Sequence, residues 1–342
     1  MPRLLACLLM ACAVLSGPVS TAPSVAVASV LCEPSELLVN PCRPWLGATA
    51  SSYPGVSSSP RAQLEAHEQR IGRQLDIVHT YHPPGSLPLN ADELYFIHRP
   101  NTIAFVNWKP AAVWADAAGG NAAVNAQIDQ AADNIEAIAP QKILLTVFHE
   151  PENDVSAGNC AGNASGAGAG SPTDYRNMWR NVHDRFAARG VDNVVWVMNY
   201  MGYSGWDCLV GELWPGNDLV DWVMFDPYGD AASTDFVANV GRFYDLLTRA
   251  SDPTHDYLSK PWGLAEWGFF NATSELGVSY FDQARQALEA HTFPLLRAYI
   301  VYDAVDSAGN ENRVAYTAGG VFDQARLDAY VAFANHPRFT VP

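Results

Sequence analysis

Short apolar runs rich in β-branched and aromatic residues recur along the chain, and they alternate with stretches whose apolar residues fall at three- and four-residue spacing. Runs of the first kind predict buried strands, and stretches of the second kind predict helices. Eight strands are expected, at Trp45–Ala50, Leu75–Tyr81, Thr102–Trp108, Ile143–Phe148, Val194–Met198, Asp221–Phe225, Trp262–Ala265 and Ala298–Tyr302.

Helices are expected between these strands. Six have a clear pattern, at Ala62–Gly72, Val124–Ile138, Tyr175–Arg189, Asp235–Ala250, Tyr280–His291 and Arg326–Asn335, and two are weaker, at Ala91–Ile97 and Cys208–Trp214. Strands that are apolar throughout and alternate with helices predict a parallel sheet that is covered on both faces. Eight such units in one domain predict an α/β fold of the closed (β/α)8, or TIM barrel, type.

The N-terminus has the pattern of an exported protein. Arg3 precedes an apolar run from Leu4 to Leu15, and small residues follow up to Ala28. This order predicts a signal peptide at residues 1–28 and a secreted, extracellular single domain at residues 29–342. The apolar run is shorter than the about 20 residues that span a bilayer, so no membrane association is expected. A lipoprotein anchored through Cys12 is an alternative, with a very short apolar run before the cysteine.

Four cysteines remain after the predicted cleavage, namely Cys32, Cys42, Cys160 and Cys208. Disulfides persist in the compartments that exported proteins reach, so two bridges are expected. Four cysteines allow three pairings. The favoured pairing joins Cys32 to Cys42 and Cys160 to Cys208, with both bridges in a structural role.

The formal net charge of the chain is −16 at pH 7. Binding to nucleic acid or to an anionic membrane needs basic patches, so this charge argues against both kinds of partner. A neutral or cationic substrate fits better. A monomer without a metal or other cofactor is expected.

Polar and aromatic residues follow most of the expected strands, at Tyr81-His82, Asn107-Trp108, His149-Glu150, Asn199-Tyr200, Asp226-Pro227-Tyr228, Glu266-Trp267 and Tyr302-Asp303. The carboxyl ends of barrel strands meet at one face, where these side chains would converge on a single site. Glu150 and Glu266 follow the fourth and seventh strands. Hydrolysis of a glycosidic bond needs two carboxyl groups, one to protonate the leaving oxygen and one to attack or to activate water.

Three of these segments carry a resemblance to glycoside hydrolase family 26: His149-Glu150, Asp226-Pro227-Tyr228 and Lys260–Gly268. A looser match runs from Leu46 to the end of the chain. The resemblance implies a retaining β-glycoside hydrolase that acts on a polysaccharide or oligosaccharide such as β-mannan. In this reading Glu150 is the acid/base and Glu266 the nucleophile. The resemblance also implies that Tyr228 hydrogen-bonds Glu266 and that His149 supports the site.

Two departures from the family pattern leave the substrate open. Pro151–Asp154 follows the His-Glu pair where mannan-degrading members often have small or aromatic residues, and the eighth strand ends in Tyr302 where a Trp is common. Mannan, mixed-linkage β-glucan and β-1,3-xylan all remain candidates, as do endo and exo action. Because aromatic faces accept sugar rings and polar groups fix hydroxyls, further substrate contacts are expected from His149, Tyr228, Trp108, Trp267, Tyr302, His82 and Asn199.

Other functional classes fit the sequence less well. A metal site built from His149, Glu150, Glu152 and Asp154 would need His at position 153 to give the zinc-protease pattern, and Pro151 opposes the helix that this pattern requires. No Gly-x-Ser-x-Gly nucleophile turn is present. A secreted carbohydrate-binding barrel without catalysis is the remaining alternative, but it would have no reason to keep both glutamates.

Overall fold

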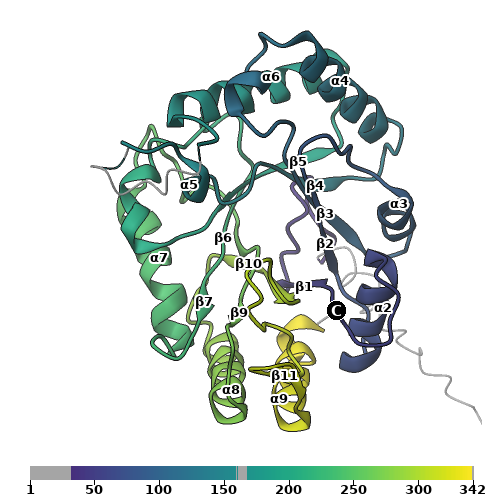
Figure 1. The fold of residues 1–342 in the computed structure, drawn as a ribbon, viewed down its shortest axis with the longest axis vertical. Helices are drawn as coiled ribbons and strands as arrows, with labels where there is room; N and C mark the ends of the chain where they lie inside the picture. The colour runs from purple at the N-terminus through teal and green to yellow at the C-terminus, as the bar shows by residue number, and fades with distance from the viewer. Residues whose placement is uncertain (1–31, 159, 161–167, 341–342) are drawn as a thin grey trace, which may run out of the picture.

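The computed structural model describes residues 32–158, 160 and 168–340, so the predicted signal peptide lies outside the described residues. The predicted closed parallel barrel is confirmed (Figure 1). Around the barrel the strands follow the order β1-β10-β8-β6-β5-β4-β3-β2. Their bounds are β1 (Trp45–Ala50), β2 (Ile77–His82), β3 (Ile103–Trp108), β4 (Ile143–Val147), β5 (Val194–Tyr200), β6 (Trp222–Phe225), β8 (Trp262–Leu264) and β10 (Leu296–Asp303).

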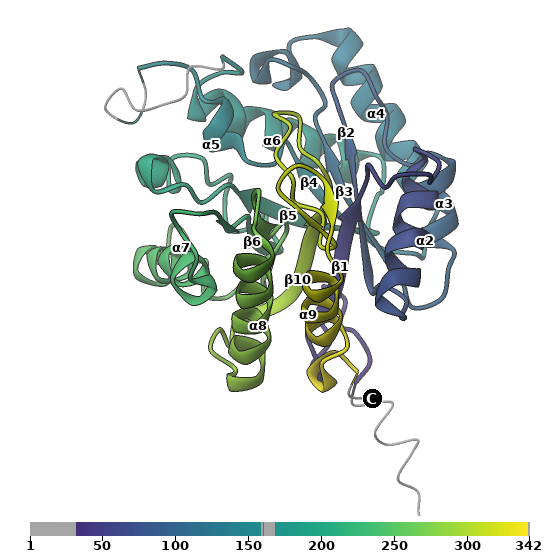
Figure 2. The same cartoon turned by 60° about the horizontal axis from the view of Figure 1, so that its bottom comes forward.

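Helices surround the barrel strands, as Figure 2 shows. They are α2 (Pro60–Ile71), α3 (Ala91–Ile97), α4 (Ala122–Glu136), α6 (Pro172–Ala188), α7 (Phe236–Ala250), α8 (Ser274–Ala290) and α9 (Gln324–Ala334). Polar caps set several of the starts. For example, Ser171 and Asp174 form a capping box at α6, and Thr273 caps α8.

The helix expected at Cys208–Trp214 is not present as an α-helix, and this prediction was wrong. The chain instead forms a 3₁₀ helix, η3 (Ser204–Leu209), followed by turns. Pro215 explains part of the difference, because a proline disfavours helical backbone at the residue before it. A 3₁₀ turn suits a segment this short.

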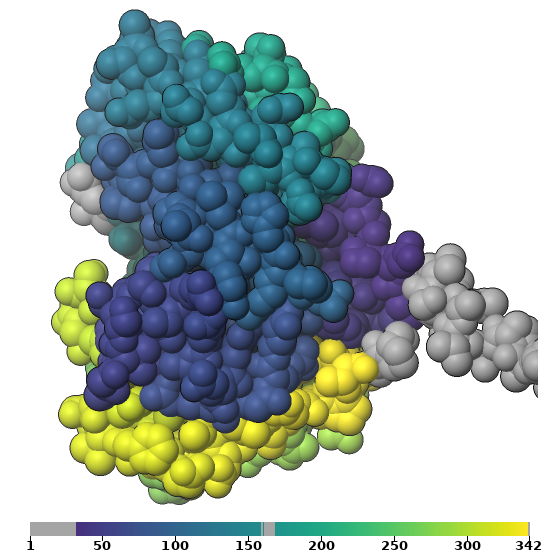
Figure 3. Space-filling model, turned by 90° about the vertical axis from the view of Figure 1, so that its right-hand side faces the viewer, coloured from purple at the N-terminus to yellow at the C-terminus, as the bar shows by residue number. Residues whose placement is uncertain are grey.

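Apolar side chains fill the barrel and close the end opposite the carboxyl ends of its strands. Ile77, Phe105 and Leu144 belong to the inner cluster. Leu38 and Val39, which precede β1, pack against this cluster at the end of the barrel opposite the carboxyl ends of the strands. Figure 3 shows the N-terminal segment in purple, near the last described residues in yellow. The open end for chemistry is therefore the carboxyl end.

Two small sheets and two disulfides lie outside the barrel strands. The two-residue strands β7 (Tyr228–Gly229) and β9 (Gly268–Phe269) pair with each other beyond β6 and β8, and β11 (Tyr316–Thr317) pairs with β12 (Val321–Phe322). Cys32 is bonded to Cys42 and Cys160 to Cys208, with Cα–Cα distances of 5.4 and 5.6 Å. These are the two pairs that the sequence analysis favours. Among the described residues no helix combines the length and apolar character needed to cross a bilayer.

Candidate active site

A cleft of about 840 Å³ opens at the carboxyl ends of the barrel strands. Its floor and walls include residues at or just beyond the ends of five barrel strands, namely Tyr81, His149, Glu150, Asp226, Tyr228, Glu266 and Tyr302. The structure therefore brings together most of the polar strand-end residues that the sequence places on one face.

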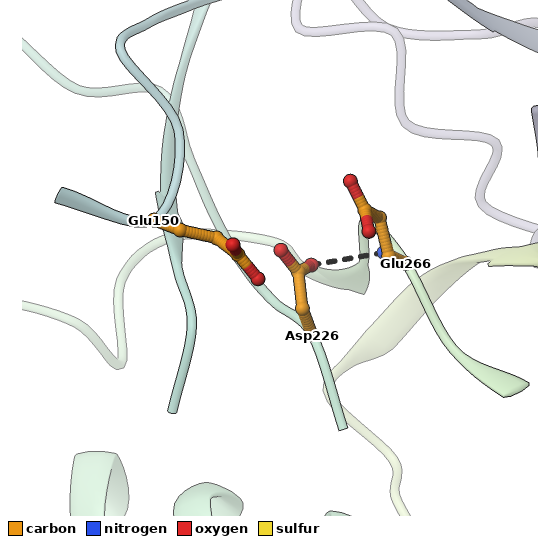
Figure 4. A group of neighbouring side chains, drawn as sticks. All are labelled: Glu150, Asp226 and Glu266. Atoms are coloured by element: carbon orange, nitrogen blue, oxygen red, sulfur yellow. Dashed lines mark hydrogen bonds between the residues drawn. The ribbon is translucent and has the colours of Figure 1, made fainter. Parts of the chain in front are cut away.

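Three carboxyl groups meet at the centre of this cleft. One oxygen from each of Glu150, Asp226 and Glu266 lies within 4.8 Å of the other two. Figure 4 shows the Asp226 side chain between the two glutamates, with its carboxyl group facing that of Glu150. Three like charges at this distance repel one another strongly, so the cluster must hold protons near neutral pH.

Glu150 lies in a turn whose backbone is strained. Phe148 and Glu150 both adopt left-handed backbone, with φ of 63° and 49°, which residues other than glycine seldom do. The N–H of Phe148 donates to the carbonyl of Trp108 on β3, and the N–H of Glu150 donates to the carbonyl of Asn199 on β5, both at 2.9 Å. These bonds to the neighbouring strands hold a conformation that would otherwise relax.

The surroundings of Glu150 favour its protonated form. Burial and the charges of Glu266 and Glu152 raise the pKa of Glu150 to about 8, against the opposing effects of a hydrogen bond with Asp226 and the charge of Lys109. A carboxyl group that keeps its proton at neutral pH can act as a general acid.

Glu266 has the opposite kind of environment. The phenol of Tyr81 donates to its Oε1 and the phenol of Tyr228 donates to its Oε2, each at 2.7 Å. Burial raises the pKa of Glu266, and these two hydrogen bonds oppose that rise. Burial raises the pKa of both phenols well above 10, so they remain donors. The ionised form of Glu266 is thereby favoured over that of Glu150.

Asp226 links the two glutamates from below. Its Oδ1 accepts the backbone N–H of Glu266 at 2.9 Å, drawn as the dashed line in Figure 4, and its Oδ2 accepts the amide of Asn199 at 2.9 Å. Burial and the charges of both glutamates raise the pKa of Asp226 well above its usual value, and it hydrogen-bonds Glu150. Because two carboxylates cannot bond without a proton between them, the Glu150–Asp226 pair shares one.

His149 is a neutral member of the site. It lines the cleft, and its ring meets that of Tyr81 edge to face at 5.5 Å between centroids. Burial and the nearby charge of Lys109 lower the pKa of His149 well below 6.5. A neutral imidazole can donate or accept one hydrogen bond to a bound hydroxyl without adding charge.

Four of the predicted substrate contacts do not reach the cleft. His82 bonds to Glu93 on α3 at 2.7 Å, and the indole of Trp108 donates to the carbonyl of Ser86. Trp267 is fully buried among aromatic rings of α7, α8 and α9, with Phe333 at 4.9 Å. Asn199 is also buried and acts on Asp226 instead of lining the cavity.

The direction of side chains along the strands explains these corrections. Tyr81 and Asn107 face the barrel axis, and their neighbours His82 and Trp108 point outward because successive residues alternate. Trp267 follows the bend after β8 and points into the helix layer. In contrast, Tyr228 and Tyr302 lie in the cleft, where the sequence analysis expects them.

Sequence reasoning missed several residues of the cleft. The sequence analysis places Tyr81 and Asp226 only at strand ends. The period of two along β2, with Ile77 and His79 inward, points Tyr81 inward as well. Phe270, stacked on Tyr228 at 4.4 Å, and the exposed Tyr203 supply aromatic surface that the sequence analysis does not identify.

The four residues of the metal site that the sequence analysis disfavours have other partners. Asp154 pairs with Lys109 at 3.2 Å, and the carboxyl group of Glu152 binds backbone N–H groups of the next loop. The cluster of Glu150, Asp226 and Glu266 has the spacing of a cation site, but phenol, amide and peptide N–H donors already point at the oxygens of Asp226 and Glu266. Such donors suit carboxylates that act directly.

Comparisons with known proteins agree with this chemistry. The sequence model of "Glycosyl hydrolase family 26" matches residues 100–255, which include the turn of Glu150 and all of β6. No curated protein matches the chain in sequence.

Solved structures share the fold across most of the chain. A GH26 β-mannanase from Bacteroides ovatus is 17% identical with a TM-score of 0.62, covering 87% of this chain and 90% of that one. A modular endo-β-1,4-mannanase from Cellulomonas fimi is 17% identical with a TM-score of 0.60, covering 86% and 71%. The YdhT protein from Bacillus subtilis is 16% identical with a TM-score of 0.56, covering 86% of each chain.

Proposed function

Because the chain belongs to glycoside hydrolase family 26, we propose that it hydrolyses a β-glycan with retention of anomeric configuration, using Glu150 as acid/base and Glu266 as nucleophile. The separation of the two carboxyl groups carries this proposal. An oxygen of Glu150 lies within 4.8 Å of an oxygen of Glu266. Retaining sites have carboxyl groups about 5–5.5 Å apart, whereas inverting sites need about 6.5–9.5 Å to admit a water molecule.

The first chemical step uses the different protonation of the two glutamates. Glu266, ionised and oriented by its two phenols, attacks the anomeric carbon as the glycosidic bond breaks. The leaving oxygen takes the proton of Glu150. This step ends with a glycosyl ester on Glu266 and an ionised Glu150.

The second step reverses these roles. The ionised Glu150 takes a proton from a water molecule as that water attacks the anomeric carbon, and the bond to Glu266 breaks. Glu266 leaves as a carboxylate, and Glu150 is protonated again. Two inversions at the same carbon give net retention.

For the substrate, we propose an internal bond of a β-mannan or a related β-glycan. Support comes from the solved structures with the same fold, since those from Bacteroides ovatus and Cellulomonas fimi are described as mannanases. The volume of the cleft has room for more than one sugar ring. We also propose that the protein is exported, on the basis of the signal-peptide pattern before Ser29 and the two disulfides.

Replacing each glutamate by alanine tests the assignment. Glu266→Ala should abolish turnover of every β-glycan that the wild type cleaves, because no carboxylate remains to attack. Glu150→Ala should still form the glycosyl-enzyme from an aryl glycoside with a good leaving group, since that step needs no proton donor. Added azide should then restore turnover and give a β-glycosyl azide.

A screen of the wild type against β-mannan, mixed-linkage β-glucan and β-1,3-xylan, with products resolved by size, identifies the substrate and tests endo action. Near-wild-type turnover by Glu266→Ala, or a first product of inverted configuration by NMR, contradicts the assignment. Absence of hydrolysis by the wild type on the whole panel would favour a carbohydrate-binding barrel without catalysis.

A further inference from the structure

Glu152 is a buried carboxyl group outside the three-carboxyl cluster. It lies two residues after Glu150 in the short helix α5 (Pro151–Asp154), with 1% of its surface exposed. In the described part of the chain no Lys or Arg forms an ion pair with it. Its oxygens instead accept two consecutive backbone N–H groups, from Met201 at 3.1 Å and from Gly202 at 3.2 Å. Burying a carboxyl group without a cationic partner costs free energy. This cost points to a functional role for Glu152.

The same peptide segment is held from its other side by a cation. Arg242 of α7 donates from Nη2 to the carbonyl of Gly202 and from Nη1 to both carboxylate oxygens of Asp207 of η3. Gly202 has a left-handed backbone with φ of 75°, and a Cβ there would lie 3.2 Å from the ring of Phe243. A side chain at this position would therefore be strained. Gly202 is hydrogen-bonded at both its N–H and its C=O.

We propose that Glu152 is a positioning residue, whose carboxyl group fastens the segment 201–204 of the cleft wall to the turn that carries Glu150. The connection is continuous. The Glu150 N–H donates to the carbonyl of Asn199 on β5, and the Glu152 carboxyl accepts the N–H groups of Met201 and Gly202, just beyond the end of that strand. The acid/base turn and this wall thus move as one unit. The inference rests on the proposed function, and it adds a residue that determines how the site handles the leaving group.

The wall that Glu152 holds lies beside the acid/base. Met201, Gly202, Tyr203 and Ser204 all line the cleft, and Tyr203 is 57% exposed with its ring edge-to-face against Trp206 at 5.1 Å. Because Glu150 donates its proton to the leaving sugar, that sugar must lie next to this turn. The fastened segment therefore borders the leaving-group end of the cleft, where an exposed aromatic ring can stack on a sugar.

Electrostatics gives Glu152 a second effect on the same reaction. Its charge is one of the causes that raise the pKa of Glu150. Burial raises the pKa of Glu152 itself to about 7, so it is ionised in the range where Glu150 loses its proton. The charged and titratable groups that face this pair are Asp207, Tyr175, Tyr200 and Arg242 around Glu152, and Lys109, Asp226, Glu266 and Tyr302 around Glu150.

The test compares Glu152→Gln with wild type on two substrates. One is an oligosaccharide whose leaving group is a sugar, and the other is the matching glycosyl fluoride, whose leaving group needs little proton donation and occupies no sugar site. The amide group of Gln cannot accept both N–H groups, so kcat/KM on the oligosaccharide should fall about 10-fold or more, as expected for hydrogen bonds to a charged group. On the fluoride kcat/KM should stay within about threefold of wild type.

The pH profile gives a readout that loss of packing alone would not move. Removing the Glu152 charge lowers the pKa of Glu150, so the basic limb of kcat/KM on the oligosaccharide should move to lower pH by about half a unit or more. Glu93→Gln is the matched control. Glu93 is also buried and accepts a backbone N–H, from Asn90 at 2.8 Å, but it lies on α3 away from the cleft. It should change stability and leave the basic limb in place.

Distinct outcomes separate this inference from the function on which it rests. An equal loss on both substrates with an unmoved basic limb makes Glu152 a packing residue and overturns the proposal. A wild type that hydrolyses neither substrate overturns the proposed function and this inference together. If Glu152→Gln fails to fold, Arg242→Met releases the same peptide from its exposed side and should again lower kcat/KM on the oligosaccharide more than on the fluoride. Equal losses in that variant overturn the proposal.

Discussion

At the scale of single residues, the ionisation of Glu266 depends on two phenols that come from opposite sides of the barrel. Tyr81 lies on β2 and Tyr228 on β7, and each donates a hydrogen bond to one oxygen of the carboxyl group at 2.7 Å. A hydrogen bond to a charged group is worth about 1.5–3 kcal/mol. The two bonds together offset a large part of the cost of burying this charge.

We expect Tyr81→Phe and Tyr228→Phe each to lower kcat/KM by about 10- to 100-fold, as loss of one such bond implies. Either change also removes an effect that lowers the pKa of Glu266. The acid limb of the pH–rate profile should therefore move to higher pH. Tyr280→Phe removes a buried phenol that accepts a hydrogen bond from Asn239 and does not itself line the cleft, so it should leave that limb unchanged. An unmoved acid limb in both cleft variants would contradict the role of the phenols.

Which strand-end residues enter the cleft could be predicted only in part. Glu150, Tyr228, Glu266 and Tyr302 lie where the sequence analysis placed them, because a polar residue after a buried strand must reach the open end of the barrel. The direction of the aromatic residues was wrong for Trp267, since the bend after β8 interrupts the alternation that would otherwise fix it.

At the scale of elements, the eight barrel strands and seven of the eight expected helices could be predicted from periodicity. The starts of some helices could not. α8 begins at Ser274, six residues before the first expected helical residue, because Thr273 caps it and Gly277 approaches Arg326 closely. The first turn of a helix often contains polar capping residues and glycine, so the apolar period that predicts a helix begins only after it. The helix expected before Pro215 was wrong for a different reason. Its apolar residues fit the period of a helix, but the segment has too few residues to form one.

The two disulfides close loops of different length. Cys160–Cys208 closes 48 residues and joins the loop after β4 to η3, next to the wall that contains Tyr203. Cys32–Cys42 closes only 10 residues ahead of β1. In the chain-entropy account, a longer loop loses more freedom in the unfolded state when it is bridged.

Thiol titration of the denatured, unreduced mature protein, which lacks Cys7 and Cys12 of the predicted signal peptide, should find no free thiol. Replacing Cys160 and Cys208 together by serine should lower the free energy of unfolding by about 4 kcal/mol, against about 3 kcal/mol for Cys32 and Cys42. Urea titrations of the two double variants measure both values. A larger loss from the shorter loop would mean that local strain, and not loop closure, sets the contribution.

At the scale of the whole molecule, the barrel buries several titratable groups whose pKa values change on folding, so the free energy of unfolding depends on pH. For one buried pair the two pKa changes nearly cancel in their effect on stability. The pKa of Glu152 rises from 4.5 to about 7 on burial, and that of His79 falls from 6.5 to about 3. Asp303 and His67 form a buried pair with pKa values of about 7 and about 3. That pair holds one proton between these values when folded, and one proton over nearly the same range when unfolded.

The sign of the pH dependence follows from the unpaired groups. A carboxyl group with a raised pKa binds its proton more tightly in the folded state, so its contribution is complete below pH 4.5 and is lost as pH rises through the folded value. For Glu152 the loss by pH 8 is about 3 kcal/mol. Glu150 and Asp226 act in the same direction. A histidine with a lowered pKa gives the opposite slope, with stability lost as pH falls from 6.5 to about 3.

These opposing slopes predict a stability maximum on the acid side of neutrality. Between pH 4.5 and 6.5 the carboxyl groups and the histidines compensate in part, and above pH 6.5 only the carboxyl groups still change. We therefore expect Tm by calorimetry to be highest near pH 5–6 and to fall steadily toward pH 8. Glu152→Gln removes one of the titrating groups, so its Tm should fall less between pH 6 and pH 8 than that of the wild type. A Tm that rises through neutrality would show that these carboxyl groups are ionised in the folded protein, contrary to the environment in which the barrel places them.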